Sequence, residues 1–95
     1  LTLDNSEAYI SKTTGTIKKA SVINRSVLSL YDVSLANIKV KKDSRLRTLE
    51  AKKKSPKGSV PNLVGSGTAI ILDEGSFLYA RGLDINGYSI GILIK

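Results

Sequence analysis

The residues best suited to chemistry in this chain are its cations, because they gather in one segment. Residues 39–57 hold nine lysines and arginines against two acids, Asp43 and Glu50. The formal charge of this segment is therefore +7, which equals the net charge of the whole 95-residue chain. Such a concentration favours contact with a polyanion, because each Lys or Arg placed near a phosphate releases condensed counterions.

The predicted polyanion contacts are the nine cations of that segment: Lys39, Lys41, Lys42, Arg45, Arg47, Lys52, Lys53, Lys54 and Lys57. An alternative interpretation is a solvated surface that keeps the protein soluble or docks on a partner protein. No aromatic residue lies inside the segment, so we expect backbone contact that tolerates any sequence rather than base readout. Phe77 and Tyr79 share one strand face, and we expect them in the core rather than on a stacking platform.

Catalytic chemistry has few residues to use in this chain. Histidine and cysteine are absent, which excludes Ser-His pairs, imidazole bases, thiolate zinc sites and disulfides. Gly65-Ser66-Gly67 lacks the spacing of a phosphate-binding loop, and the adjacent acids Asp73 and Glu74 are typical turn formers. We therefore predict that the protein is not an enzyme and that it uses no cofactor, no metal and no small-molecule substrate.

The elements that carry these residues are expected to be strands, because β-branched apolar residues alternate with polar ones. Glu74-Gly75 separates the apolar runs 68–73 and 76–81, and Asn86-Gly87 precedes the last run. Both pairs suit tight hairpin turns. The C-terminal third is therefore predicted to be a three-stranded antiparallel meander.

The N-terminal half gives weaker signals. Residues 8–12 and 16–23 are predicted to form another hairpin. Residues 26–36 fit either a strand that is apolar on both faces or a short helix. For residues 43–57 the sequence does not decide among helix, strand and disorder, although 44–54 is rich in helix formers.

The fold class predicted from these elements is all-β, or β-rich with one short helix. We expect a small antiparallel barrel or sandwich built from hairpins. The chain length indicates one domain, residues 1–95, with a basic insertion or loop at about 39–58.

One regularity suggests an internal duplication. An offset of 50 residues aligns Val27 with Phe77 and Leu28 with Leu78, and it also aligns Ser26 with Ser76. The alternative is chance, because any two alternating β segments match at some even offset. A true duplication would make the barrel or sandwich pseudo-symmetric, with the basic segment between its halves.

The last apolar run is expected to form an oligomer interface. Tyr88, Ile90, Ile92 and Ile94 share one face, which we predict to be buried. The opposite face is also largely apolar, and a strand of this kind at a sheet edge pairs readily with a neighbouring chain.

Three functions fit these observations. The first is a non-catalytic structural subunit, either of a homo-oligomer or of a larger assembly of the virion, filament or nucleoprotein type, whose basic segment contacts an acidic partner or polyanion. The alternatives are a stand-alone nucleic-acid-binding module and a small inhibitor or adaptor that docks on an acidic protein surface.

No apolar run reaches the length of a membrane span, so no membrane partner is expected. Because the chain opens on Leu1 and has no Met, we expect either a processed product or a piece that lacks its natural start.

Overall fold

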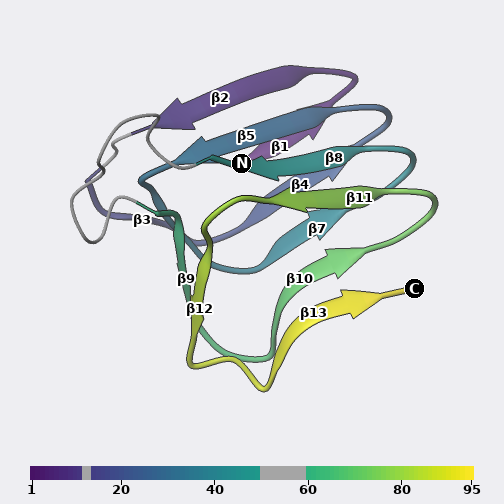
Figure 1. Cartoon of the computed structure of the whole chain (residues 1–95). Helices are drawn as coiled ribbons and strands as arrows, with labels where there is room; N and C mark the ends of the chain where they lie inside the picture. Colours follow the sequence, from purple (N-terminus) through teal and green to yellow (C-terminus); the bar gives the residue numbers. More distant parts are fainter. Residues whose placement is uncertain (12–13, 50–59) are drawn as a thin grey trace.

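The strands of this chain pair in parallel and wind into a β-solenoid. A computed structural model describes residues 1–11, 14–49 and 60–95. In these ranges each turn of the chain passes through three sheets, which we name A, B and C, and about four turns stack on one another (Figure 1). Sheet A consists of β1 (Thr2–Asp4), β4 (Ala20–Ile23), β7 (Ile38–Val40), β10 (Thr68–Leu72) and β13 (Ile90–Ile94). Sheet B consists of β2 (Glu7–Ser11), β5 (Val27–Tyr31), β8 (Arg45–Thr48) and β11 (Phe77–Ala80), and sheet C of β3 (Thr16–Ile17), β6 (Ser34–Leu35), β9 (Asn62–Val64) and β12 (Asp84–Asn86).

The core lies inside the stack, where inward residues form columns with one residue from each turn. In sheet A, one column joins Leu3, Val22, Val40 and Leu72 through successive parallel pairs. In sheet B, Leu28 lies beside Leu46, and both are fully buried. Burying side chains of this size contributes about 1.5–3 kcal/mol each, so these columns supply most of the drive to fold.

The predicted antiparallel barrel or sandwich is wrong, although the β-rich character of the chain is confirmed. The runs 68–73 and 76–81 do form strands, β10 and β11, but these strands belong to different sheets. β10 pairs with β7 and β13, and β11 pairs with β8, in each case in parallel. The predicted C-terminal meander is therefore replaced by the last turn of the solenoid.

The turn residues explain this error, because they bend the chain where a hairpin would reverse it. Glu74 and Gly75 both have positive φ, of 50° and 76°, which a two-residue hairpin turn also requires. Lys42-Asp43 and Asn24-Arg25 have the same left-handed backbone at the A-to-B corner of the two preceding turns. The Asp43 N–H donates to the Glu74 carbonyl at 2.9 Å, so the corners stack directly. The turn residues that suit a hairpin also suit a corner of the solenoid. Only the pairing of strands that are far apart in the sequence distinguishes the two folds.

A ladder of serines follows these corners. The Ser6 N–H donates to Ser26 Oγ at 3.0 Å, the Ser26 N–H to Ser44 Oγ at 3.1 Å, and the Ser44 N–H to Ser76 Oγ at 3.2 Å. Ser26 and Ser44 are completely buried. Among the described residues no buried side-chain nitrogen or oxygen lacks a partner. The ladder therefore satisfies polar groups that burial would otherwise leave unpaired.

The two helices considered from sequence are not formed by the described residues, which contain strands and turns alone. None of them forms a helix that is long and apolar enough to cross a membrane. Residues 26–36 become β5 and β6, and the start of the 44–54 segment becomes β8. Residues 50–59 lie outside the described residues, so the predicted structure of that part stays untested.

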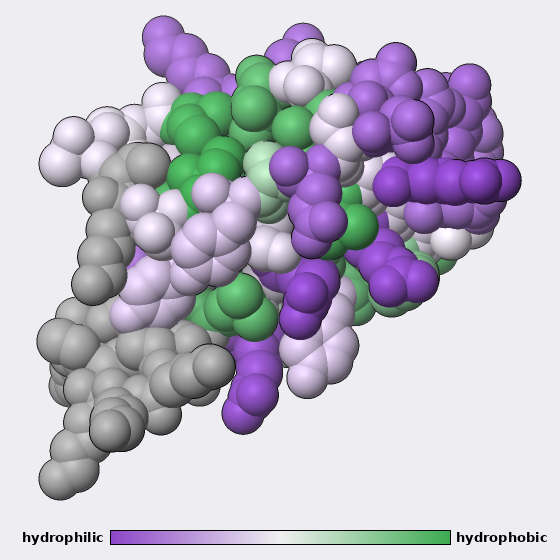
Figure 2. All heavy atoms as spheres, turned by 90° about the horizontal axis from the view of Figure 1, so that it is seen from above, coloured by the Kyte–Doolittle hydropathy of each residue, from purple (hydrophilic) through white to green (hydrophobic). Residues whose placement is uncertain are grey.

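The last turn is covered on one side. In the described residues β13 pairs with β10 alone, and its Ile92 and Ile94 lie beside Ile70 and Leu72. Ile70 is fully buried, whereas Ile92 is 44% exposed and Ile94 is 75% exposed. The face predicted to be buried is therefore largely open in the part of the chain that the structure describes, where β10 is the only neighbour of β13. The opposite end of the stack, viewed from the β2 side, also shows apolar surface in its middle (Figure 2).

The serine ladder gives the first testable prediction. Ser44→Ala removes the acceptor of the buried Ser26 N–H. An unpaired buried donor costs about 1–3 kcal/mol, so the free energy of unfolding in urea should fall by that amount. Ser66→Ala, at an exposed serine, is the control and should change it by less than about 0.5 kcal/mol. Equal stability of the two variants would show that the ladder is not a stabilising element.

Candidate functional site

The outer face of sheet B brings arginines and aromatic rings together. We call it the arginine–aromatic face, and its residues line a shallow hollow of about 470 Å³: Arg45, Arg47, Leu49, Phe77, Tyr79 and Arg81. Parallel register places Arg45 beside Phe77 and Arg47 beside Tyr79. The inward neighbours Leu46 and Thr48 are fully buried, so β8 holds its arginines on the solvent side by strict alternation.

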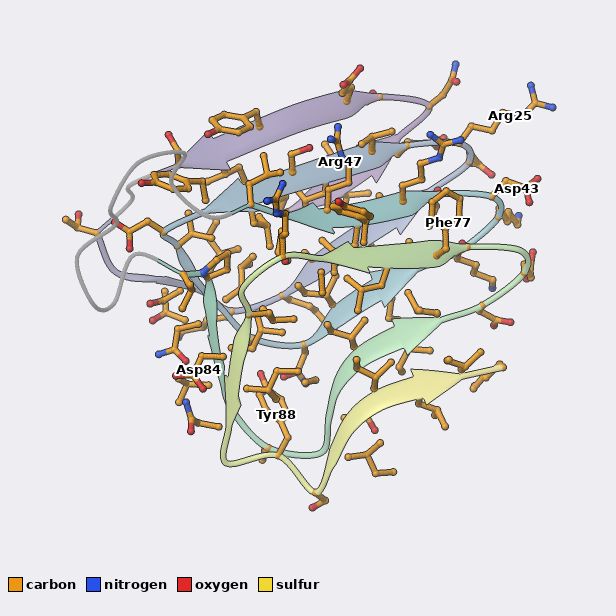
Figure 3. All side chains as sticks on the ribbon, viewed as in Figure 1. Arg25, Asp43, Arg47, Phe77, Asp84 and Tyr88 are labelled. Carbon is orange, nitrogen blue, oxygen red and sulfur yellow. The ribbon has the colours of Figure 1, made fainter. Side chains whose placement is uncertain are left out.

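One arginine and one aromatic ring of this face contact each other, Arg45 and Phe77. The guanidinium carbon of Arg45 lies 4.8 Å from the centre of the Phe77 ring. Figure 3 shows Arg47 and Phe77 on the same side of sheet B. A cation–π contact at an exposed site contributes about 0.5–1 kcal/mol, and it leaves the guanidinium edge free to donate hydrogen bonds. The stack therefore orients a cation without neutralising it.

The charge of this face is uniformly positive. Its lining holds three arginines and no carboxylate. Glu7 lies in the same column as Arg45, but Val27 stands between them. The face therefore offers several hydrogen-bond donors of fixed charge and attracts groups that accept hydrogen bonds and carry negative charge.

Aromatic side chains are concentrated on this sheet. Four of the five aromatic residues of the chain lie in strands of sheet B: Tyr9, Tyr31, Phe77 and Tyr79. Phe77 is 47% exposed and Tyr79 is 52% exposed. The prediction that these two belong to the core is therefore wrong. They alternate with the half-buried Leu78 as expected, but the ring-bearing side of β11 faces outward.

The predicted basic segment does not form one surface. Arg45 and Arg47 reach the arginine–aromatic face, while Lys39 lies on the outer side of β7 in sheet A. Lys41 Nζ lies 3.5 Å from Glu74 Oε1, an exposed ion pair that contributes about 0–1 kcal/mol. Lys42 is at the A-to-B corner, beside Asp43. The remaining predicted contacts lie outside the described residues: Lys52, Lys53, Lys54 and Lys57.

The predicted oligomer interface is also divided. Ile90, Ile92 and Ile94 are exposed along β13. Tyr88 is half-buried instead, and its hydroxyl accepts a hydrogen bond from the Asn37 N–H at 3.1 Å. A Cβ on Gly65 would stand 2.6 Å from that hydroxyl oxygen, so Tyr88 fills the space that this glycine leaves. Tyr88 therefore serves internal packing, and the three isoleucines alone form an open edge.

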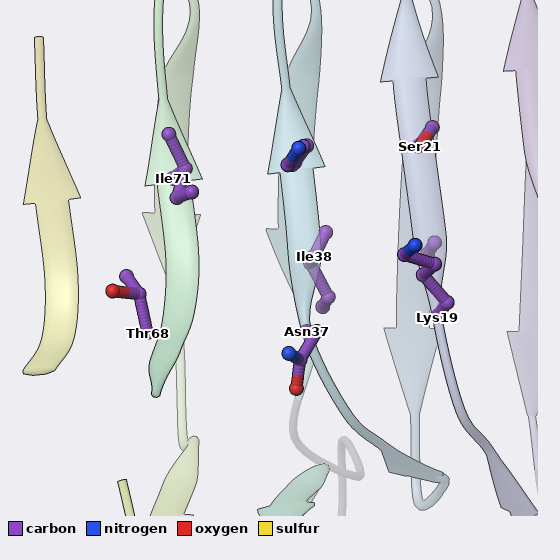
Figure 4. A pocket seen from close by; sticks show the side chains of 8 residues that line it. Lys19, Ser21, Asn37, Ile38, Thr68 and Ile71 are labelled. Atoms are coloured by element: carbon purple, nitrogen blue, oxygen red, sulfur yellow. The ribbon is translucent and has the colours of Figure 1, made fainter. Parts of the chain in front are cut away.

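A second hollow, of about 430 Å³, lies on the outer side of sheet A (Figure 4). Lys19, Ser21, Asn37 and Lys39 line it together with Thr68. It holds two lysines but no aromatic ring, and no planar cation. Among the described residues no cluster of three His, Cys, Asp or Glu could hold a metal ion. The arginine–aromatic face is therefore the better candidate for a binding site.

Sequence reasoning missed Arg81 and the juxtaposition of β8 with β11. The signal was present as a repeat, because Ser6, Ser26, Ser44 and Ser76 each precede by two residues an inward Ala or Leu of sheet B. Aligning the turns on these serines places Arg45-Leu46-Arg47 over Phe77-Leu78-Tyr79. The offset of 50 residues compares β5 with β11, which are two turns apart in sheet B. It therefore passes over β8, the strand between them that carries Arg45 and Arg47.

Comparisons of the chain with protein-family models, with curated proteins and with solved structures gave no match. The function of the arginine–aromatic face therefore has to be argued from its own geometry and charge.

Proposed function

We propose that this protein is a binding protein without catalytic activity and that its arginine–aromatic face binds an extended, linear polyanion. The observation that carries the proposal is the set Arg45, Arg47 and Arg81 on one exposed face whose lining contains no carboxylate. Charge of one sign on a regular surface attracts polymers of the opposite sign by releasing their counterions.

The solenoid suits a linear ligand because its outer surface is regular in two directions. Outward residues recur about every 6.7 Å along a strand, and neighbouring strands lie about 4.8 Å apart. Arginine is the cation best fitted to phosphate, sulfate or carboxylate groups, since its planar fork donates two parallel hydrogen bonds. A chain of anionic groups can therefore meet several guanidinium groups without bending.

The polyanion proposal predicts a specific salt dependence. Labelled inorganic polyphosphate should bind the protein with an affinity that falls steeply as the NaCl concentration rises. Replacing Arg45, Arg47 and Arg81 together by Gln should lower the slope of log affinity against log salt by about 2, at roughly 0.7 per lost phosphate contact. Fluorescence anisotropy at several salt concentrations measures the slope.

The matched control replaces three exposed lysines that lie elsewhere, Lys18, Lys19 and Lys95, by Gln. It removes the same charge and should change the slope much less. Urea unfolding of both variants checks that each remains folded. An equal loss of slope in the two variants would show that only net charge matters and would contradict the proposed face. Neutralising Lys52, Lys53 and Lys54 forms a separate arm, because their contribution remains a prediction.

A second candidate function, subunit of an assembly, rests on the open edge of β13. In the described residues sheet A has five strands, whereas sheets B and C have four each. If a second copy stacked on β13 in the same orientation, sheet A would continue from one copy to the next. Sheets B and C would each lack one strand at the junction. A copy related by a two-fold axis avoids this mismatch, because β13 then pairs with itself in antiparallel orientation. No charged residue lies between Asp84 and Lys95 to protect this edge.

The assembly candidate predicts dimers that depend on β13. Ile92→Lys should lower the mass measured by light scattering at high concentration, whereas Val64→Lys, at an apolar residue 49% exposed on β9, should not.

The chain has no cysteine, so a single introduced one is diagnostic. With the axis at residue 92, Ile92→Cys should cross-link to its copy, but Ile94→Cys, about 14 Å from its own copy, should not. A monomer at all concentrations would exclude this function.

A further inference from the structure

The spacing on the arginine–aromatic face defines a repeating unit. Phe77 and Tyr79 are successive outward residues of β11, so they stand about 6.7 Å apart along the strand. Arg45 and Arg47 have the same spacing on β8 and pair in register with those two residues. Each step of two residues therefore presents one cation and one ring.

A ligand that matches this unit carries one negative charge and one flat ring per repeat. Inorganic polyphosphate has the charge but no ring. A single-stranded nucleic acid has both, because every nucleotide contributes one phosphodiester and one base whose π-face stacks on aromatic side chains. An extended, unstacked strand advances further per nucleotide than the 3.4 Å of a duplex strand, as the spacing of the face requires.

Hydrogen-bond chemistry distinguishes this ligand from an acidic polysaccharide. Sugar hydroxyls donate hydrogen bonds and need acceptors, yet the hollow is lined by no carboxylate and no amide side chain, and the Tyr79 hydroxyl is the one side-chain acceptor among its lining residues. Guanidinium groups donate only. A phosphodiester accepts only. The face therefore satisfies a nucleic-acid backbone, whereas it would leave many sugar hydroxyls unmatched.

We infer that the polyanion is a single-stranded nucleic acid, with two consecutive bases stacked at Phe77 and Tyr79 and their phosphates bound by Arg45 and Arg47. This inference rests on the proposed function, because it names the ligand class of the same face. The guanidinium of Arg45 already lies over the Phe77 ring, so a base at this position extends an existing stack of planar groups. Arg81, at the end of β11, binds the next phosphate.

The same lining predicts weak sequence preference. Asn and Gln side chains read adenine, and Asp and Glu side chains read cytosine; none of these types lines the hollow. Arginine can read guanine, but the three arginines of the hollow are assigned to phosphates. Stacking and phosphate contact tolerate every base. Homopolymers that differ only in base should therefore bind with similar affinity, after correction for the free energy of base stacking within each unbound strand.

The test compares two labelled eight-nucleotide ligands with the same number of phosphates, oligo-dT and its fully abasic analogue. Inorganic polyphosphate of similar length is the third probe. Oligo-dT should bind at least about tenfold more tightly than the abasic strand, since each stacked base contributes separately. Tyr79→Leu should reduce this preference by the contribution of one of the two stacked bases, while leaving the affinity for the abasic strand unchanged.

Tyr9→Leu is the matched control, because Tyr9 lies in the same column at the far edge of sheet B and is 61% exposed. It should preserve the preference for oligo-dT. The chain contains no tryptophan, so Tyr79→Trp supplies a single indole whose fluorescence oligo-dT should quench and the abasic strand should not.

The outcomes separate this inference from the proposed function. Equal affinity for oligo-dT and the abasic strand, with the salt slope intact, would overturn the nucleic-acid inference and leave a polyanion-binding face. Tighter binding of a sulfated or carboxylated polysaccharide of equal charge than of oligo-dT would also overturn it. Failure of all the probes, polyphosphate included, would overturn both.

Discussion

The structure depends on the in-register stacking of parallel turns. Each residue has as its neighbour the residue at the same position in the next turn, so columns rather than isolated contacts determine stability. Apolar columns such as Val22, Val40 and Leu72 form the core. The serine ladder keeps the corners in register, because each Oγ accepts the N–H of the preceding turn. A shift of one residue would move every inward side chain to the surface.

The same constraint creates the candidate site. Corresponding residues of β8 and β11 lie one full turn apart in the chain, yet stacking places their outward side chains side by side. A ring beside a cation is compatible with this arrangement, because a guanidinium stacks on a ring and avoids another cation. Outward side chains of sheet B can therefore be replaced without disturbing the stacking of the turns, since that stacking depends on inward residues. Binding and folding use different residues of the same strands.

Much of the strand content follows from the sequence, and the topology does not. Period-two alternation located β7, β10 and β11 to within a residue or two, because alternation is a local property. Parallel pairing depends on partners about 20 to 30 residues away, and no local signal distinguishes a corner turn from a hairpin when both use left-handed residues such as Glu74 and Gly75. Unequal turn lengths conceal the repeat further, since Val27 precedes its partner Arg45 by 18 residues, whereas Arg45 precedes its partner Phe77 by 32.

The candidate site was partly predictable for the same reason. Arg45 and Arg47 were identified from charge, which is a local signal, but their aromatic neighbours come from the next turn. Lys39, Lys41 and Lys42, although close in sequence, diverge because the chain turns the A-to-B corner between β7 and β8. The exposure of Ile92 and Ile94 was missed because alternation shows which side of a strand is inward, and it does not show whether another strand covers that side.

The central claim is that β11 pairs in parallel with β8 and does not form a hairpin with β10. Disulfide formation tests it directly, because the chain has no cysteine of its own. In the solenoid, Arg47→Cys combined with Tyr79→Cys places two thiols on neighbouring strands within the range of Cα separations that a disulfide spans. The account predicts that this pair oxidises readily, and that Ile71→Cys with Leu78→Cys, which a hairpin at Glu74-Gly75 would bring together, does not. The reverse pattern would contradict the solenoid and the site built on it.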